Sequence, residues 1–339
     1  MDIPVQNIYY LLSYAWNKLD EGNIVEVDKI DTTKLYNLFA SVLASGTLYL
    51  LKKGLYREYS NFSDDLKGIR GKLQLTNSLS RQLFRYGKAH CSFDELSYNI
   101  IFNQILKTTI YNLLLLKELD INIKDRLYLI NDYLYEIENI ELSSRLFSSL
   151  TFHRNNNYYS FLLNICQFIY ENIFINENYG SSKFRDFVRD EKRMAHLFEE
   201  FIRNFYKLNL LNAKVQREYY EWDVDEKAKS IFPRMITDVS IIYPNKKIII
   251  ETKFYKNVLQ TNYNKESIKA DNLYQIYAYL KRAEKDLSSN QELEAILLYP
   301  TVNDDYKFDT TLDGHNFKMR TINLNQEWSQ IHKDLMNLI

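Results

Sequence analysis

Met235-Ile-Thr-Asp-Val-Ser-Ile-Ile-Tyr-Pro-Asn-Lys-Lys-Ile-Ile-Ile-Glu-Thr-Lys253 is the stretch that decides the fold. Two apolar runs flank a Pro-Asn pair, a pattern that predicts strands over 235–243 and 247–253 joined by a tight turn. Side chains alternate between the faces of a strand, so Glu251 and Lys253 share one face and Thr252 takes the other. An antiparallel hairpin can bring Asp238, which we expect in the middle of the first strand, beside that pair.

This set of residues suits the hydrolysis of a phosphodiester. Carboxylate oxygens of Asp238 and Glu251, with the backbone carbonyl of Thr252, are the hard ligands that Mg²⁺ prefers. Such an ion stabilises the charge that builds on the phosphate and activates a bound water, while Lys253 positions that water. The sequence therefore predicts catalytic residues Asp238, Glu251 and Lys253, with metal ligands Asp238, Glu251 and Thr252.

A surface ion pair would give the same Glu-x-Lys spacing, so this alternative stays open on spacing alone. Two features favour the catalytic interpretation. An unpaired Asp238 inside an apolar strand would be costly. The surrounding pattern also predicts the scaffold that such a site needs, namely a helix over 190–209 and a strand over 214–222 before the hairpin, and a helix over 271–284 and strands over 294–299 and 317–324 after it. That order predicts a mixed sheet flanked by helices.

The first 180 residues are predicted to be mainly helical with a small β region. Helices are expected from Pro4 onward, over 34–53 up to Gly54, and over 159–175, with strands and loops over 56–90. Ser92-Phe-Asp-Glu95 resembles a capping box and predicts a helix running to about Leu116. The polar stretch 176–189 predicts a domain boundary, which gives an α+β or α/β chain with domains 1–180 and 181–339.

Further residues are candidates for auxiliary roles. Gln275 and Tyr279 share a helical face and are expected to orient Lys253 or touch DNA. Glu199 is a candidate third carboxylate. By pattern alone, ordinary helix surface explains Gln275 and Tyr279 somewhat better, and Glu199 is also explained as part of a solvated glutamate pair with Glu200.

Basic residues near the predicted site are candidates for contacts with the DNA backbone, and these are Arg203, Lys207 and Arg217. They are at least as well explained as ordinary helix and strand exterior.

Composition excludes several classes of protein. The net charge is −1, so any nucleic-acid contact needs a local basic surface or a partner. Two distant cysteines and five histidines without ligand spacing argue against a zinc site and fit a reducing cytoplasm. No apolar run is long enough to span a membrane. No Gly-x-x-x-x-Gly-Lys-Ser/Thr loop is present, so GTP or ATP is not expected to bind this chain.

Several stretches together resemble the McrC family of McrBC-type modification-dependent (5-methylcytosine) restriction systems. They are residues 3–16, 69–72, 93–96, 233–238, 251–255, 272–275, 298–300 and 325–328. The second half is also similar to the PD-(D/E)xK nuclease superfamily, with a Gln-x-x-x-Tyr element like that of its RecB-type branch. Thr237-Asp238 stands where that superfamily has Pro-Asp.

The resemblance implies an Mg²⁺-dependent DNA endonuclease subunit that acts with an McrB-like hexameric AAA+ GTPase on double-stranded DNA containing modified cytosine. It implies that residues 1–180 dock on the ring and stimulate its GTPase, that the ring binds the GTP, and that residues 181–339 cut DNA. It also places Asp238, Glu251 and Lys253 on the catalytic positions. Ile69, Arg70, Gly71 and Lys72 are candidate ring contacts.

Two other functions remain open. One is a standalone repair or junction nuclease, which would cut DNA without a partner. The other is a non-catalytic assembly protein that only activates a ring ATPase or GTPase. The mainly helical first half, which contains no recognisable DNA-reading module, argues against the first.

Overall fold

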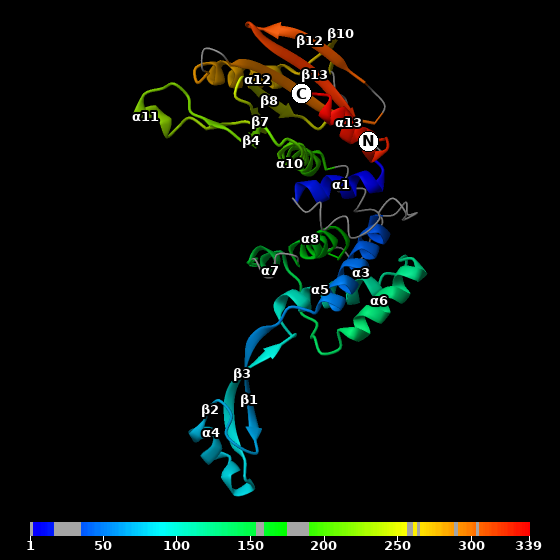
Figure 1. Cartoon of the computed structure of the whole chain (residues 1–339), viewed down its shortest axis with the longest axis vertical. Helices are drawn as coiled ribbons and strands as arrows, with labels where there is room; N and C mark the ends of the chain where they lie inside the picture. Colours follow the sequence, from blue (N-terminus) through cyan, green and yellow to red (C-terminus); the bar gives the residue numbers. More distant parts are fainter. Residues whose placement is uncertain are drawn as a thin grey trace. The chain divides into compact units, whose positions relative to one another are not determined.

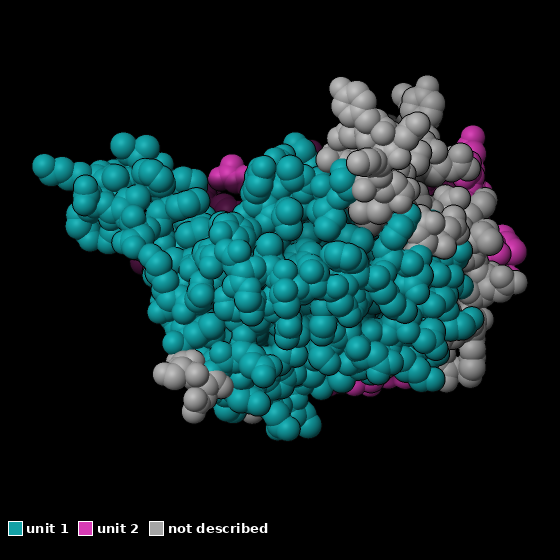
Figure 2. All heavy atoms as spheres, turned by 90° about the horizontal axis from the view of Figure 1, so that it is seen from above, with its two compact units in different colours: residues 1–35, 178–339 teal, residues 36–177 magenta. Residues whose placement is uncertain are grey.

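A computed structural model describes residues 3–16, 35–153, 159–174, 190–255, 260–262, 265–287, 291–302 and 305–339. The chain forms two compact units, one of residues 1–35 with 178–339 and one of residues 36–177 (Figure 2). Within the described ranges, no helix has both the length and the apolar character that a membrane crossing requires.

The larger unit is built on a mixed six-stranded sheet in the order β12-β13-β11-β8-β7-β4. Its strands are β4 (Lys214–Gln216), β7 (Val239–Ile242), β8 (Lys246–Thr252), β11 (Glu292–Thr301), β12 (Lys307–Leu312) and β13 (His315–Asn323). The three central strands β8, β11 and β13 run parallel, and the other neighbours pair antiparallel. Strands β8 and β11 are buried along almost their whole length, which explains their continuous apolar runs. The prediction of a mixed sheet is confirmed.

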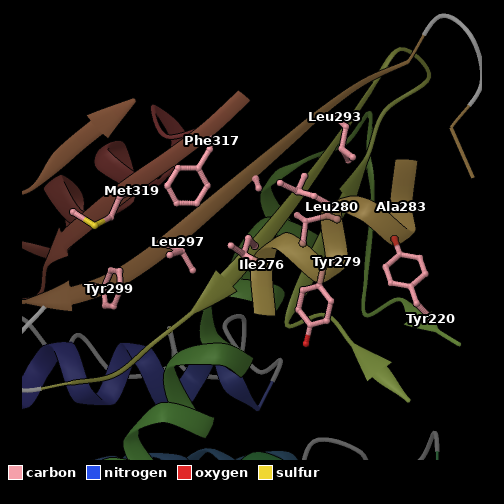
Figure 3. Close-up of a cluster of buried hydrophobic side chains, with 12 residues drawn as sticks. Tyr220, Ile276, Tyr279, Leu280, Ala283, Leu293, Leu297, Tyr299, Phe317 and Met319 are labelled. Carbon is pink, nitrogen blue, oxygen red and sulfur yellow. The ribbon is translucent and has the colours of Figure 1, made fainter. Parts of the chain in front are cut away.

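Helices cover this sheet (Figure 1). Helix α12 (Ala270–Glu284) packs Ile276 and Leu280 against Leu297 and neighbouring side chains of the sheet (Figure 3). Helix α10 (Glu191–Asn209) contacts β4, β7 and β8. Its start is fixed by Asp190, whose carboxylate accepts hydrogen bonds from the backbone N–H groups of the first turn. These two helices approach the same end of β8.

The N-terminal helix α1 (Val5–Ala15) belongs to this larger unit, although the sequence analysis placed it in the first domain. Asn204 of α10 donates to the carbonyls of Tyr14 and Ala15, and Asn7 donates to the carbonyl of Leu324. Helical periodicity shows that α1 has a buried face, but it does not show which distant helix covers that face. The C-terminal helix α13 (Trp328–Met336), which the sequence analysis did not predict, contacts β13.

Shorter elements complete the larger unit. They are β5 (Tyr219–Tyr220), α11 (Glu226–Lys229), β6 (Met235–Ile236), β9 (Gln260–Asn262) and β10 (Lys265–Ser267). Strand β5 pairs with β6, and β9 pairs with β10, both antiparallel. The single strand expected over 214–222 is thus two strands with different partners.

The second unit combines helices with a three-stranded antiparallel sheet in the order β1-β3-β2. Its elements are α3 (Leu35–Lys53), β1 (Glu58–Leu66), β2 (Lys72–Leu73), α4 (Leu75–Ser80), η2 (Leu83–Tyr86), β3 (Ala89–Ser97), α5 (Ile101–Leu114), α6 (Ile121–Tyr133), α7 (Ser144–Ser148), α8 (Tyr159–Ile169) and the π-helical turn η3 (Tyr170–Phe174). Gly54 follows α3 with a φ of +96°, as the predicted helix end requires. The mainly helical half with a small β region is confirmed.

The capping box predicted at 92–95 is wrong. These residues lie in β3, paired with β1, and the helix begins at Ile101. The Ser92 hydroxyl donates to the side chain of Asn61 on the neighbouring strand instead of capping a helix. Pairing with a strand about thirty residues earlier in the chain overrides a local motif that only the nearest residues define.

Candidate functional site

The site lies where β8 ends and where the chain enters β7. Asp238 is not in the middle of a strand as predicted, because it occupies a bend between β6 and β7. The reason is a change of partner: β6 pairs with β5, whereas β7 pairs with β4 and β8. Asp238 therefore stands outside both ladders, directly before a strand that pairs with β8.

Thr252 holds the carboxylate of Asp238. Oxygen Oδ2 accepts hydrogen bonds from the backbone N–H of Thr252 at 2.8 Å and from its hydroxyl at 2.7 Å. Burial raises the pKa of Asp238, the negative charge of Glu199 raises it further, and the bonds from Thr252 oppose that rise. The threonine side chain, for which the sequence suggested no role, thus fixes one of the two central acids.

Glu251 is the more deeply buried acid, with a side chain only 1% exposed. Its Oε1 accepts a hydrogen bond from Lys253 Nζ at 2.6 Å. Its Oε2 is buried and has no hydrogen-bond partner among the described residues. Burial, followed by the nearby charge of Asp238, raises the pKa of Glu251 to about 8, although Lys253 opposes the rise. A buried carboxylate with one unmatched oxygen is an arrangement that a cation would relieve.

A chain of hydrogen bonds orients Lys253 from helix α12. Lys253 Nζ donates to Gln275 Oε1 at 2.8 Å, and Gln275 Nε2 donates to the hydroxyl of Tyr279 at 2.8 Å. That hydroxyl donates to the carbonyl of Ile236 at 2.7 Å. Burial, followed by the charge of Glu251, raises the pKa of Tyr279 to about 12, so the hydroxyl stays protonated. Tyr279 also packs in the core between α12 and the sheet (Figure 3), and this packing holds its ring, the last side chain in the series of hydrogen bonds, in place.

The remaining acidic candidate, Glu199, is paired with arginines. Its Oε1 accepts from Arg203 Nη1 at 2.9 Å and is also bound by Arg217. Arg203 further pairs with Glu200 and donates to the backbone carbonyl of Asp238 at 3.0 Å. Both arginines that the sequence suggested as DNA contacts thus have partners inside the protein. Lys207 is exposed in the last turn of α10.

An open pocket of about 490 Å³ gathers most of these residues. Its lining is Glu191, Lys192, Ala195, His196, Glu199, Asp238, Glu251, Thr252, Lys253, Phe254, Tyr255 and Gln275. Lys192, His196 and Tyr255 are among the lining residues that were not predicted as site residues from the sequence. The two residues on α10 lie on the same side as Glu199, three and seven positions before it, so helical spacing from Glu199 would have found them. Tyr255 ends the stretch 251–255 that resembles the McrC family, but no spacing in the sequence assigns it a role.

The donor set fits a magnesium ion. Asp238 and Glu251 could supply oxygen ligands, both have raised pKa values, and Glu251 Oε2 is an acceptor without a partner among the described residues. Across the described ranges, no three His, Cys, Asp or Glu side chains converge as a metal-binding group. Mg²⁺ needs only one or two carboxylates, because it keeps several waters and binds the substrate phosphate. A structural zinc site would need four ligands, so this set does not fit one.

Fold and site together define a mixed-sheet α/β protein with a carboxylate–lysine cleft at the carboxyl end of a central strand. Comparison with known proteins gives the family. The chain belongs to the McrBC 5-methylcytosine restriction system components, whose family model matches residues 6–300. The resemblance inferred from the sequence motifs is confirmed.

Known relatives are similar over almost the whole chain. The type IV methyl-directed restriction enzyme EcoKMcrBC of Escherichia coli K12 is 31% identical over 339 residues, which are 99% of this chain and 97% of the relative. A solved half-complex from a tetradecameric assembly of Thermococcus gammatolerans McrB AAA+ hexamers with bound McrC matches with a TM-score of 0.61 and 16% identity, covering 99% of this chain and 76% of that chain. A cryo-EM structure of the McrBC complex from the same organism matches with a TM-score of 0.46 and 15% identity, covering 84% and 70%. The 0.61 match supports the fold.

Proposed function

We propose that this chain is the Mg²⁺-dependent DNA endonuclease subunit of a McrBC-type restriction complex, with a nuclease core of the PD-(D/E)xK type. One observation carries the proposal. Asp238, Glu251 and Lys253 meet in one open pocket, and the buried Glu251 keeps an oxygen without a partner among the described residues. A plain surface ion pair would be exposed, whereas the Glu251 side chain is 1% exposed and that of Lys253 16%.

Each residue then has a defined task. Asp238 and Glu251 would hold the ion, and the backbone carbonyl of Thr252 remains a candidate third ligand. The bound ion supplies stabilisation of the charge on the phosphate and a more acidic water. Lys253 is held by Glu251 and Gln275, and it would position the attacking water and neutralise charge that develops on the phosphate.

The family supplies the partners in this proposal. One relative is a methyl-directed restriction enzyme, and one matching structure contains McrB AAA+ hexamers with bound McrC. We therefore expect this chain to act with an McrB-like GTPase ring on DNA containing modified cytosine, to stimulate the GTPase of that ring, and to leave GTP binding to the ring. The 36–177 unit is the candidate docking part.

Residues 69–72 remain the candidate ring contact within that unit. Residues 69–71 lead into β2, Lys72 is its first residue, and Ile69 is 69% exposed. Arg70 lies over the ring of Phe93, 4.4 Å from its centroid. Gly71 has a φ of +68°, and a Cβ there would lie 2.4 Å from the carbonyl oxygen of Ser92. This stretch is thus shaped by its neighbours and presents a large apolar side chain to solvent.

The test uses the purified chain with its partner ring, GTP, Mg²⁺ and methylated DNA. Asp238→Asn and Lys253→Met should each lower the rate of cleavage by about 10²-fold or more, while stimulation of the partner GTPase stays unchanged. Glu218→Gln is the matched control. Glu218 is also a partly buried carboxylate paired with a lysine, Lys247 at 3.0 Å, but it does not line the pocket.

Two outcomes would contradict the proposal. Undiminished cleavage by Asp238→Asn would support the non-catalytic activator instead. Cleavage by the isolated chain with Mg²⁺ alone, at the rate seen with ring and GTP, would support a standalone nuclease. The GTPase readout separates the expected loss of cleavage from misfolding of the whole chain, because a variant misfolded throughout should lose stimulation as well.

A further inference from the structure

The backbone at Asp238 depends on an arginine from a different part of the fold. Asp238 lies at the bend between β6 and β7, outside both strand ladders. Its carbonyl oxygen accepts a hydrogen bond from Arg203 Nη1 at 3.0 Å. A carbonyl in a partly buried bend needs such a donor, since an unpaired one would cost about 1–3 kcal/mol. The contact ties the bend to helix α10.

Arg203 is itself held on α10. Glu199, four residues earlier, accepts from Nη1 at 2.9 Å, and Glu200, three residues earlier, pairs with Nη2. The Arg203 side chain is only 12% exposed. A planar guanidinium bonded to two carboxylates and a carbonyl has little freedom left. Helix α10 is a firm support, because Phe198, Phe201 and five further residues of its inner face are buried.

We propose that Arg203 is a positioning residue that sets the place of the Asp238 carboxylate in the metal site. Two residues from different elements hold Asp238 in place. Thr252 of β8 holds its carboxylate, and Arg203 of α10 holds its backbone. Glu199 then serves as the anchor of Arg203. This inference rests on the proposed function, and it replaces the sequence-based interpretation of Arg203 as a contact to the DNA backbone.

Metal binding by the full chain, without DNA, is the decisive measurement. Mn²⁺ binding followed by electron paramagnetic resonance should be weakened about 10–100-fold in Arg203→Ala, and cleavage with ring, GTP and Mg²⁺ should fall in parallel. Added guanidinium should restore part of both, because it can occupy the space that the side chain leaves. Arg203→Lys should be intermediate, since an ammonium cannot span the same partners. Stimulation of the partner GTPase should not change.

Arg282→Ala is the matched control. Arg282 lies on α12, donates to the backbone carbonyl of Glu221 at 3.1 Å and pairs with Asp286 four residues later, but it does not line the pocket. It therefore makes the same kinds of contact away from Asp238, and its loss should leave Mn²⁺ binding unchanged.

Several results would overturn the inference. One is wild-type Mn²⁺ affinity in Arg203→Ala. Another is weaker DNA binding in Ca²⁺ with unchanged Mn²⁺ affinity, which would make Arg203 a DNA contact after all. If Arg203→Ala does not fold, Arg203→Lys decides, and unaltered Mn²⁺ affinity there counts against the role. Failure of the proposed function looks different, because Asp238→Asn would then cut DNA normally.

Discussion

Replacing Glu251 by glutamine should make the metal-free protein more stable, by an amount that grows as the pH rises from about 4.5 to 8. The pKa of Glu251 is about 8 in the folded chain against an ordinary 4.5. The folded chain therefore keeps this proton in a pH range where the unfolded chain has lost it. Below about pH 4.5 both states are protonated and the carboxyl costs nothing. As the pH rises toward 8 the free energy of unfolding falls, and above 8 the full cost is present. Glutamine cannot ionise, so it avoids this cost.

The size of the effect follows from the same shift. A rise from 4.5 to about 8 corresponds to an upper limit of about 5 kcal/mol, at about 1.4 kcal/mol for each pKa unit. For a folding unit of 150–250 residues, 1 kcal/mol moves the melting temperature by about 2–4 °C. The upper limit thus corresponds to roughly 10 °C or more, and a shift of a few degrees is easily measured.

Thermal melting of wild type and Glu251→Gln in EDTA, at pH 5 and pH 8.5, tests this reasoning. The variant should melt clearly higher at pH 8.5 and differ only slightly from wild type at pH 5. Adding Mg²⁺ at pH 8.5 should raise the melting temperature of wild type and not of the variant. Glu218→Gln is the control, and its melting temperature should change in the opposite direction, because the substitution breaks an ion pair with Lys247. Equal differences at both pH values, or a less stable Glu251→Gln at pH 8.5, would refute the reasoning.

Three further predictions concern the supports of the site and the other unit. Gln275→Leu should lower cleavage about tenfold without changing Mn²⁺ affinity, because Lys253 loses one of its two acceptors; single-turnover cleavage measures this. Gly71→Ala should reduce stimulation of the partner GTPase and spare Mn²⁺ binding, since a Cβ would meet the Ser92 carbonyl at 2.4 Å; a GTPase titration is the check. Asn7→Ala should destabilise the larger unit by about 1–3 kcal/mol, because two carbonyls lose their donor; melting in EDTA detects it.

The elements that carry the acids were predictable because their patterns are local. Alternation along β8 places Glu251 and Lys253 on one face, and the structure joins them at 2.6 Å. Helical spacing places Gln275 and Tyr279 together, and their side chains are bonded at 2.8 Å. In both cases the decisive contacts join residues only two or four positions apart in the sequence.

What escaped prediction depends on contacts between distant segments. The bend at Asp238 arises because β6 and β7 pair with different strands. No residue near Asp238 indicates that the partner strand changes there. The roles of Thr252 and Arg203 require the register of β7 against β8 and the packing of α10. The apparent capping box at 92–95 failed for the same reason, since β3 is formed by pairing with β1.

Local sequence pattern and long-range contacts place different residues of the site. The local alternation of side chains places Glu251 and Lys253 at the end of β8, where burial makes the Glu251 carboxyl costly to ionise. Long-range contacts then keep Asp238 next to it, although the negative charges of Asp238 and Glu199 oppose that placement. Without the contacts from Thr252 and Arg203, the free energy would be lowest with the Asp238 side chain turned toward water. The contacts from Thr252 and Arg203 hold Asp238 in place, so the two acids stay close together in the folded chain. A bound cation would relieve their electrostatic repulsion, and this relief would strengthen its binding. A site assembled this way should trade stability for metal affinity, and the variants that weaken metal binding by removing the charge of a buried acid, as Glu251→Gln does, should be the ones that melt higher.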